Sequence, residues 1–235
     1  MKRKEQTVSI AYLAMYIALY VVLKYIGSFI PFFDMPNGGS VEIELIAVFI
    51  ASYHLGWVKG LAVGLLSWLI TIVLGFPMYF VHPVQIFLDY AGPLMACGMA
   101  SLLWPFENLG KVGSVVTSII LGLGAFFGIR LSFGTEILPT VCAVTAALVI
   151  GAGSFYYLGT KRQFGIVISM LIKYIFTVLS GAYYWADGTA AGSMEAWTFS
   201  LSYNLGYNLM TMIVCILAVP LLIERLKAAG IAFKK

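Results

Sequence analysis

The composition of this chain is that of an integral membrane protein. Its 235 residues are 61% hydrophobic and 10% charged, whereas soluble domains carry roughly 25% charged residues. Apolar runs cover almost the whole sequence and leave no room for a separate soluble domain. The net charge of +4 comes from basic residues split between the termini and short turns, which excludes a nucleic-acid-binding patch.

The first apolar run, residues 8–30, follows the charged start MKRKE. It is too long for the apolar region of a signal peptide, which spans roughly 7–15 residues, and it lacks a small-residue cleavage site. We therefore predict a retained first membrane span.

Glycine, proline and charge clusters divide the chain into eight apolar segments, which predict an all-α membrane protein. A bilayer core about 30 Å thick needs roughly 20 apolar residues per helix. The second and third segments are short, so we expect tilted or partial spans there. The segments are residues 8–30, 42–57, 60–76, 83–104, 113–133, 138–158, 164–186 and 197–223.

The distribution of charge predicts the orientation in the membrane. With a cytoplasmic N-terminus, most lysines and arginines fall on the cytoplasmic side, as the positive-inside rule requires. Both termini are then expected in the cytoplasm, and most acidic residues fall on the outer side. Outer loops are commonly poor in lysine and arginine, so only the positions of particular acids can distinguish a binding site from simple topology.

The sequence contains no recognisable cofactor or metal motif. Cys97, Cys142 and Cys215 lie singly in three segments without CxxC spacing, which is typical of packing residues. There is no GxxxxGK[ST] phosphate loop for ATP hydrolysis and no HExxH zinc spacing. We expect neither a cofactor nor a metal in this chain.

The stretch HPVQIFLDY, residues 82–90, places polar groups at the start of the fourth segment. His82, Gln85 and Asp89 follow i, i+3, i+7 spacing and are expected on one helix face. A carboxylate inside a span costs roughly 2.5–3.5 kcal/mol on insertion scales and is a functional candidate by default. The alternative is that Asp89 pairs with a lysine such as Lys24 or Lys173.

Two acids, Glu42 and Glu44, open the second segment after a glycine-containing turn. Helix neighbours two apart point about 200° away from each other. We therefore expect at most one of them to face a shared pocket. The other is expected to cap the helix N-terminus, where negative charge is favoured.

Thr177, Gly181 and Trp185 repeat at four-residue intervals along the seventh segment. This stripe indicates either packing or an aromatic belt at the membrane interface, and we interpret Tyr183 and Tyr184 in that way. Trp185 is our candidate for ligand contact. Gly181, one turn before it, is expected to leave room for a flat ligand beside the indole.

The last segment carries amide side chains on the same face as an aromatic residue. Trp197, Leu201, Asn204 and Asn208 share this face. Amides in hydrocarbon must find partners, so bonding between helices is the alternative to ligand binding here.

The polar positions of the second, fourth, seventh and eighth segments all fall toward the predicted outer half, which favours one pocket that opens outward. Acids with aromatic rings suit a flat, cationic heteroaromatic ligand. A ring face adds roughly 0.5–2 kcal/mol to the binding of a cation.

The motifs GGSVEIELI, HPVQIFLDY, SGAYYW and SLSYN, in this order, resemble the thiamine-specific substrate-binding subunits of energy-coupling factor transporters, the ThiT or YuaJ family. The resemblance implies a subunit that binds thiamine from outside. It also implies import driven by a separate module of a transmembrane coupling protein and two ATPase subunits, which use the ATP.

The resemblance also assigns roles to residues by position. Glu42 or Glu44 is the acid of the second helix, Asp89 and Tyr90 are the acid and aromatic pair, Trp185 is the stacking indole and Asn204 is the amide. Ala11, Ala14 and Ala18 form a small-residue motif that implies docking of the first helix on the coupling protein. Packing within the molecule remains the alternative, because such residues let any two helices approach closely.

Four positions depart from the pattern of this family. Thr177 stands where many members have histidine, and Gly38 and Ser67 where some have tryptophan. Phe199 stands where a tyrosine is common. A thiamine precursor such as hydroxymethylpyrimidine, or another small vitamin, is therefore an alternative ligand.

The chain is also longer than the six-span pattern of the family. We predict a single membrane domain, residues 1–235, with the first four core helices in residues 8–104 and the last two in residues 161–225. Residues 105–160 are expected to form an inserted helical hairpin.

Two other functions remain as alternatives. One is an ion-coupled secondary transporter. The other is an intramembrane hydrolase with His82 as the base beside Ser67, Ser180 or Ser200, although no serine lies in a GxSxG motif.

Overall fold

The computed structural model describes residues 2–36, 38–103, 111–133, 136–161, 164–186 and 188–233. Over these ranges the chain is helical and contains no β-strand, which confirms the predicted all-α class. The elements are α1 Lys2–Gly27, η1 Pro31–Phe33, α2 Leu45–Leu55, α3 Trp57–Val73, α4 Pro83–Ile86, η2 Phe87–Ala91, α5 Gly92–Gly98, α6 Lys111–Phe133, α7 Ile137–Lys161, α8 Phe164–Tyr184 and α9 Met194–Ala228.

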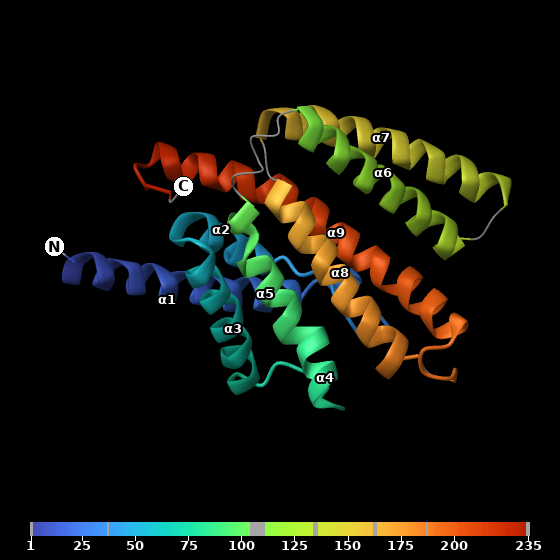
Figure 1. The fold of residues 1–235 in the computed structure, drawn as a ribbon, viewed down its shortest axis with the longest axis horizontal. Coiled ribbons are helices and arrows are strands. Elements are labelled where there is room, and N and C mark those ends of the chain that lie inside the picture. The colour runs from blue at the N-terminus through green and yellow to red at the C-terminus, as the bar shows by residue number, and fades with distance from the viewer. Residues whose placement is uncertain are drawn as a thin grey trace.

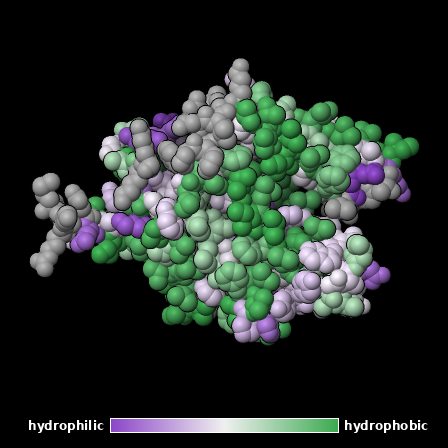
Figure 2. All heavy atoms as spheres, in the orientation of Figure 1, coloured by the Kyte–Doolittle hydropathy of each residue, from purple (hydrophilic) through white to green (hydrophobic). Residues whose placement is uncertain are grey.

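Five of the described helices, α1, α6, α7, α8 and α9, are long and apolar enough to cross a bilayer. Figure 2 shows apolar side chains across the middle of the viewed face and more hydrophilic ones toward its edges. Such a surface suits contact with lipid. The molecule is a multi-pass membrane protein.

Helix α2 is a short helix at the centre of the bundle. Its 11 residues extend over about 16 Å, roughly half of the bilayer core. All of its side chains except that of Ile46 are buried, with Phe49 and Tyr53 fully enclosed. Its apolar character on every side therefore reflects burial among other helices rather than exposure to lipid.

The fourth predicted segment is not one regular α-helix. It consists of α4, the π-helical turn η2 and α5 in direct succession. Pro93 has no N–H to donate to the carbonyl of Asp89, and its ring crowds that carbonyl. The amide of Gly92 bonds instead to the carbonyl of Phe87, five residues back. The π turn at Asp89 therefore has a local cause in the sequence.

Helices α3 and α5 cross at unusually short range because both have glycines at the contact. A Cβ added at Gly60 would lie 2.4 Å from the carbonyl oxygen of Gly98. A Cβ at Gly98 would lie 2.6 Å from the Cα of Leu61. Small residues allow this close approach of helices in lipid, and it fixes the position of α5 relative to α3.

Helices α6 and α7 form a hairpin beside α9, separated from α1 and α3 by α8 and α9 (Figure 1). Gly122 of α6 lies against the backbone of Ala147 in α7. On its other side, α6 places Gly124 and Gly128 against Leu209 and Leu205 of α9. The division of the chain into a six-helix core and an inserted hairpin stays a prediction.

Candidate ligand-binding site

The carboxylate of Asp89 bonds to two side chains from different parts of the chain. The amide Nε2 of Gln85 donates to Oδ2 of Asp89 at 2.6 Å. The indole Nε1 of Trp185, just beyond the end of α8, donates to the same oxygen at 2.9 Å. The structure therefore brings together three residues that the sequence had placed in one site.

Tyr79, in the segment between α3 and α4, completes this cluster. Its backbone N–H donates to the hydroxyl of Tyr90 at 2.9 Å, and its carbonyl accepts from that hydroxyl at 3.3 Å. Its ring meets the edge of Trp185 at a centroid distance of 6.1 Å. Backbone and ring of Tyr79 thus contact three neighbours of Asp89 in this cluster, namely Tyr90, Gln85 and Trp185.

Trp68 of α3 adds a further aromatic face. Its ring lies nearly parallel to that of Tyr90, with centroids 6.0 Å apart and an interplanar angle of 11°. Among the described residues, the indole nitrogen of Trp68 and the hydroxyl of Ser67 are buried without a hydrogen-bond partner. An indole therefore follows directly after Ser67, the position where some members of the family have a tryptophan.

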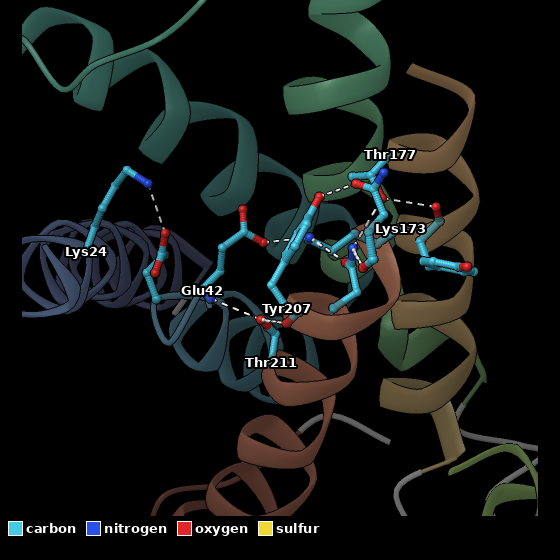
Figure 3. A network of polar contacts seen from close by, with 10 residues as sticks. Lys24, Glu42, Lys173, Thr177, Tyr207 and Thr211 are labelled. Carbon is cyan, nitrogen blue, oxygen red and sulfur yellow. Dashed lines mark hydrogen bonds and ion pairs between the residues drawn. The ribbon is translucent and has the colours of Figure 1, made fainter. Parts of the chain in front are cut away.

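Both lysines that were alternative partners of Asp89 pair with glutamates instead (Figure 3). Lys24 Nζ lies 3.0 Å from Oε1 of Glu44. Lys173 Nζ lies 2.7 Å from Oε2 of Glu42. The hypothesis that a lysine pairs with Asp89 is wrong for these two residues.

The two glutamates lie before helix α2 rather than on it, and the expected side-chain cap is not formed. Helix α2 begins at Leu45, so Glu42 and Glu44 precede its first turn and helical spacing does not separate them. Glu44 makes no side-chain capping bond. It is 3% exposed, and a buried carboxylate is stabilised by a paired cation such as Lys24.

A polar network extends from Lys173 into α9. Lys173 Nζ donates to Oδ1 of Asn208 at 2.8 Å. Nδ2 of Asn208 donates to the hydroxyl of Thr177 at 3.2 Å and to the carbonyl of Asn204 at 2.8 Å. The bonds of Asn208 to Lys173 and Thr177 therefore join α8 to α9, as the packing alternative proposed.

The side chain of Asn204 forms its hydrogen bonds with other residues of α9. Its Nδ2 donates to the carbonyl and to the hydroxyl of Ser200, at 2.9 and 3.1 Å. Its Oδ1 accepts a hydrogen bond from the hydroxyl of Tyr207. The side chain is 6% exposed, so the structure gives it a clear role in packing.

Gly181 does not leave open space on its free side, contrary to our expectation. A Cβ at this position would lie 2.2 Å from Oγ of Ser200 and 3.0 Å from Nδ2 of Asn204. The missing side chain lets α9 approach α8. The glycine is therefore required for close helix packing.

Among the described residues, His82 makes no hydrogen bond to Gln85 or Asp89. Its ring is exposed and caps α4, where Nδ1 accepts from the backbone N–H of Val84 at 3.2 Å. It stacks on Tyr184 with a centroid distance of 5.5 Å. The three groups of HPVQIFLDY therefore do not form a single cluster, because His82 precedes the helix and is extended.

The segment before α2 folds against α9. The hydroxyl of Tyr203 donates to the carbonyl of Gly38 at 2.9 Å. Gly39 has a φ of +83°, and a Cβ there would lie 2.9 Å from the ring of Tyr207. The backbone N–H of Glu42 donates to the hydroxyl of Thr211 at 3.0 Å. These contacts hold Glu42 beside Lys173.

Sequence reasoning missed Trp68, Tyr79 and Tyr207, and considered Lys173 only as a partner of Asp89. Lys173 had a usable signal, because an ionisable residue within an apolar helix is a functional candidate. The aromatic residues had no such signal in a chain with 15% aromatic content.

The named acids around Asp89 and the two glutamates outnumber the lysines that pair with them. Asp89, Glu42 and Glu44 are three acids, whereas Lys24 and Lys173 are two cations, both already paired with the glutamates. The site therefore has one excess negative charge, on Asp89. Such a site favours a ligand with one positive charge.

Fold and site together define a class: a multi-pass helical membrane protein with charged and aromatic side chains held inside its bundle. Intramembrane groups of this kind mark solute pathways in transporters.

The chain belongs to the thiamine transporter protein family, Thia_YuaJ, whose model matches residues 10–229. This match confirms the resemblance to the ThiT or YuaJ family. The chain is also 27% identical over 222 residues to the thiamine transporter ThiT of Bacillus subtilis (strain 168), covering 94% of this chain and 93% of that protein. No solved structure matches the chain with significance.

Proposed function

We propose that this protein is the substrate-binding membrane subunit of an energy-coupling factor transporter, and that it binds thiamine from the outer side. The observation that carries the proposal is the Asp89 carboxylate. It is held by Gln85 and Trp185 and is paired with neither Lys24 nor Lys173. A cationic ring that enters beside Trp185 would offset this charge and gain an aromatic contact.

The proposed ligand contacts centre on Asp89, Trp185, Tyr90 and Trp68. Tyr90 and Trp68 offer two nearly parallel rings, and Trp68 has a free indole N–H among the described residues. Gln85 acts in this proposal through Asp89, and we assign no direct contact to His82.

Other members of the predicted site shape its walls. Glu42 is partly exposed, with 27% of its side chain accessible, and it can meet a ligand while it stays paired with Lys173. Glu44, Thr177 and Asn204 are buried and bonded within the protein. In the proposal they hold the helices that carry the contacting residues.

The excess negative charge also favours one form of the ligand. Thiamine carries a permanent positive charge on its thiazolium ring, which suits a site with one unpaired carboxylate. A phosphate ester would add negative charge near Asp89 and Glu42 and would be repelled. We therefore expect a preference for the unphosphorylated vitamin.

Helix α1 presents the surface proposed for the transmembrane coupling protein. Ala11, Ala14 and Ala18 are exposed, whereas Tyr16 and Tyr20 of the same helix are buried in the core. Their exposure favours docking of a partner over packing within this chain, which was the alternative. A helix of the coupling protein could approach them closely.

The energy source in this proposal lies outside the chain. Two partner ATPase subunits would hydrolyse ATP, and this chain would contribute ligand binding without a cofactor. Both termini are proposed to face the cytoplasm, on the basis of the positive-inside rule. Figure 1 is compatible with this orientation, because α4 and the end of α8 lie away from both termini.

The alternative functions have less support. In the part of the chain that the structure describes, no serine hydroxyl bonds to His82; that of Ser200 donates to the carbonyl of Val178 at 2.7 Å. An ion-coupled transporter would show uptake into vesicles that contain only this protein. The proposed subunit would bind ligand alone and would transport only with its ATPase module.

Titration of the purified protein tests the ligand. We expect thiamine to quench tryptophan fluorescence with a Kd on the order of 1 nM to 1 μM, and to quench much less in Trp185→Phe. Hydroxymethylpyrimidine and thiamine monophosphate are compared under the same conditions. Binding of hydroxymethylpyrimidine without thiamine would retain the class of protein and change the ligand; binding of neither would contradict the proposal.

A further inference from the structure

Gln85 uses every polar atom of its side chain within the protein. Its Oε1 accepts from the backbone N–H of Val81 at 3.1 Å. Its Nε2 donates to the carbonyl of Tyr79 at 3.1 Å and to Oδ2 of Asp89 at 2.6 Å. The side chain is 0% exposed. An amide nitrogen has two protons to donate, so Gln85 has none left for a ligand.

These bonds fix the orientation of the Asp89 carboxylate. Gln85 donates to Oδ2 from α4, and Trp185 donates to the same oxygen from just beyond the end of α8. Two donors on one oxygen restrict rotation of the carboxylate. Oδ1 receives no hydrogen bond from the described residues, and it is the oxygen available to a ligand.

We propose that Gln85 is a positioning residue that presents Oδ1 of Asp89 to the ligand and ties this orientation to the segment Tyr79 to Val81. The inference rests on the proposed function, in which Asp89 meets the ligand. Gln85 was a candidate ligand contact in the sequence, and its bonding pattern gives it this indirect role instead.

The arrangement also selects the chemistry of the ligand. Gln85 and Trp185 both donate to Oδ2 of Asp89, and neither Lys24 nor Lys173 pairs with this acid. Oδ1 is therefore left as the acceptor for a ligand. A ligand must therefore bring a cationic group or an N–H donor to Oδ1. A ligand that presents a carboxylate or a phosphate at this point would meet repulsion.

The first test requires no ligand. The indole N–H signal of Trp185 in ¹⁵N-tryptophan-labelled protein, assigned with Trp185→Phe, reports its bond to Asp89. In Gln85→Met, which keeps the length of the side chain but removes its amide, we expect this signal to move to lower proton shift and to exchange faster with water. Gln6→Met, the same change at an exposed position, should leave it in place.

The second test is a double-mutant cycle measured by thiamine titration. We expect Gln85→Met to weaken binding about tenfold in the wild-type background and less than about twofold in the Asp89→Asn background. Equal losses in both backgrounds would show that Gln85 does not act through Asp89 and would overturn the inference.

The two tests separate this inference from the proposed function. If wild-type protein does not bind thiamine, the proposed ligand fails, while the indole signal still tests Gln85. An unchanged Trp185 signal in Gln85→Met overturns the inference whatever the ligand. If Gln85→Met does not fold, Gln85→Leu also removes the amide donor without adding a charge, and the same displacement of the signal is required.

Discussion

The indole nitrogen of Trp185 donates to Oδ2 of Asp89 at 2.9 Å, across a sequence separation of 96 residues. This bond joins the π-helical turn η2 to the end of α8. It places an indole ring, through its N–H edge, beside a carboxylate that pairs with neither Lys24 nor Lys173. The ligand preference proposed here depends on this arrangement.

The Lys173–Glu42 pair gives a prediction on stability. Lys173 is 3% exposed, so Glu42→Gln leaves its charge without a counter-charge. Breaking such a pair costs roughly 3–5 kcal/mol, and we expect a large fall in the thermal unfolding midpoint in detergent.

The double variant Lys173→Met with Glu42→Gln removes both charges and should recover most of the lost stability. Lys227→Met, at an exposed position, serves as the control and should change little. Equal stability of Glu42→Gln and wild type would contradict a role for the pair.

Gly181→Ala tests the close contact of α8 and α9. The new Cβ would lie 2.2 Å from Oγ of Ser200, so the helices must move apart. Overpacking of this kind costs typically about 1–3 kcal/mol, measured by thermal unfolding. Gly206→Ala is the matched control, because a Cβ there meets no atom within 4 Å, and it should be neutral or stabilising. A stable Gly181→Ala would show that the contact is not tight.

Ala14→Leu and Ala18→Leu separate partner docking from ligand binding. Both positions are exposed on α1, so we expect thiamine affinity and thermal stability to match the wild type. Uptake by cells that contain the complete transporter should fall, because the larger side chains hold the partner helix away. Val115→Leu, exposed on α6, is the control. Normal uptake by both alanine variants would refute docking at this surface.

Removal of the α6–α7 hairpin tests whether ligand binding depends on this predicted insertion. In the intact protein, Leu205 and Leu209 of α9 lie beside Gly128 and Gly124 of α6. The deletion exposes these two leucines. Both are apolar and are compatible with lipid, so we expect thiamine binding to persist in protein with residues 105–160 replaced by a short linker. Loss of binding in a folded deletion variant would assign the hairpin to the ligand site.

The helices of this protein were largely predictable from the sequence, because runs of apolar residues and their breaks define membrane spans directly. The π turn was not predicted, although Pro93 provides its cause. The pattern of Gln85 and Asp89 at four-residue spacing was read correctly as one face. His82 was misplaced because the helix begins only after it.

The pairing within the site could not be read from the sequence. Which acid meets Lys24 or Lys173 depends on how α1, α8 and the segment before α2 pack, and no local pattern records this. The prediction of open space beside Gly181 was wrong for a related reason. An absent side chain creates space only if no neighbouring helix fills it, and here Ser200 does.

The affinity of Asp89→Asn for thiamine tests the central claim most directly. The substitution keeps the size of the side chain and one oxygen that can accept from Gln85 and Trp185. It removes the negative charge and replaces the oxygen that faces the ligand by an amide nitrogen. We expect thiamine to bind at least about 100-fold more weakly than to the wild type, with the thermal stability of the ligand-free protein preserved. Equal affinity in the two proteins would contradict the proposal that Asp89 meets the positive charge of the ligand.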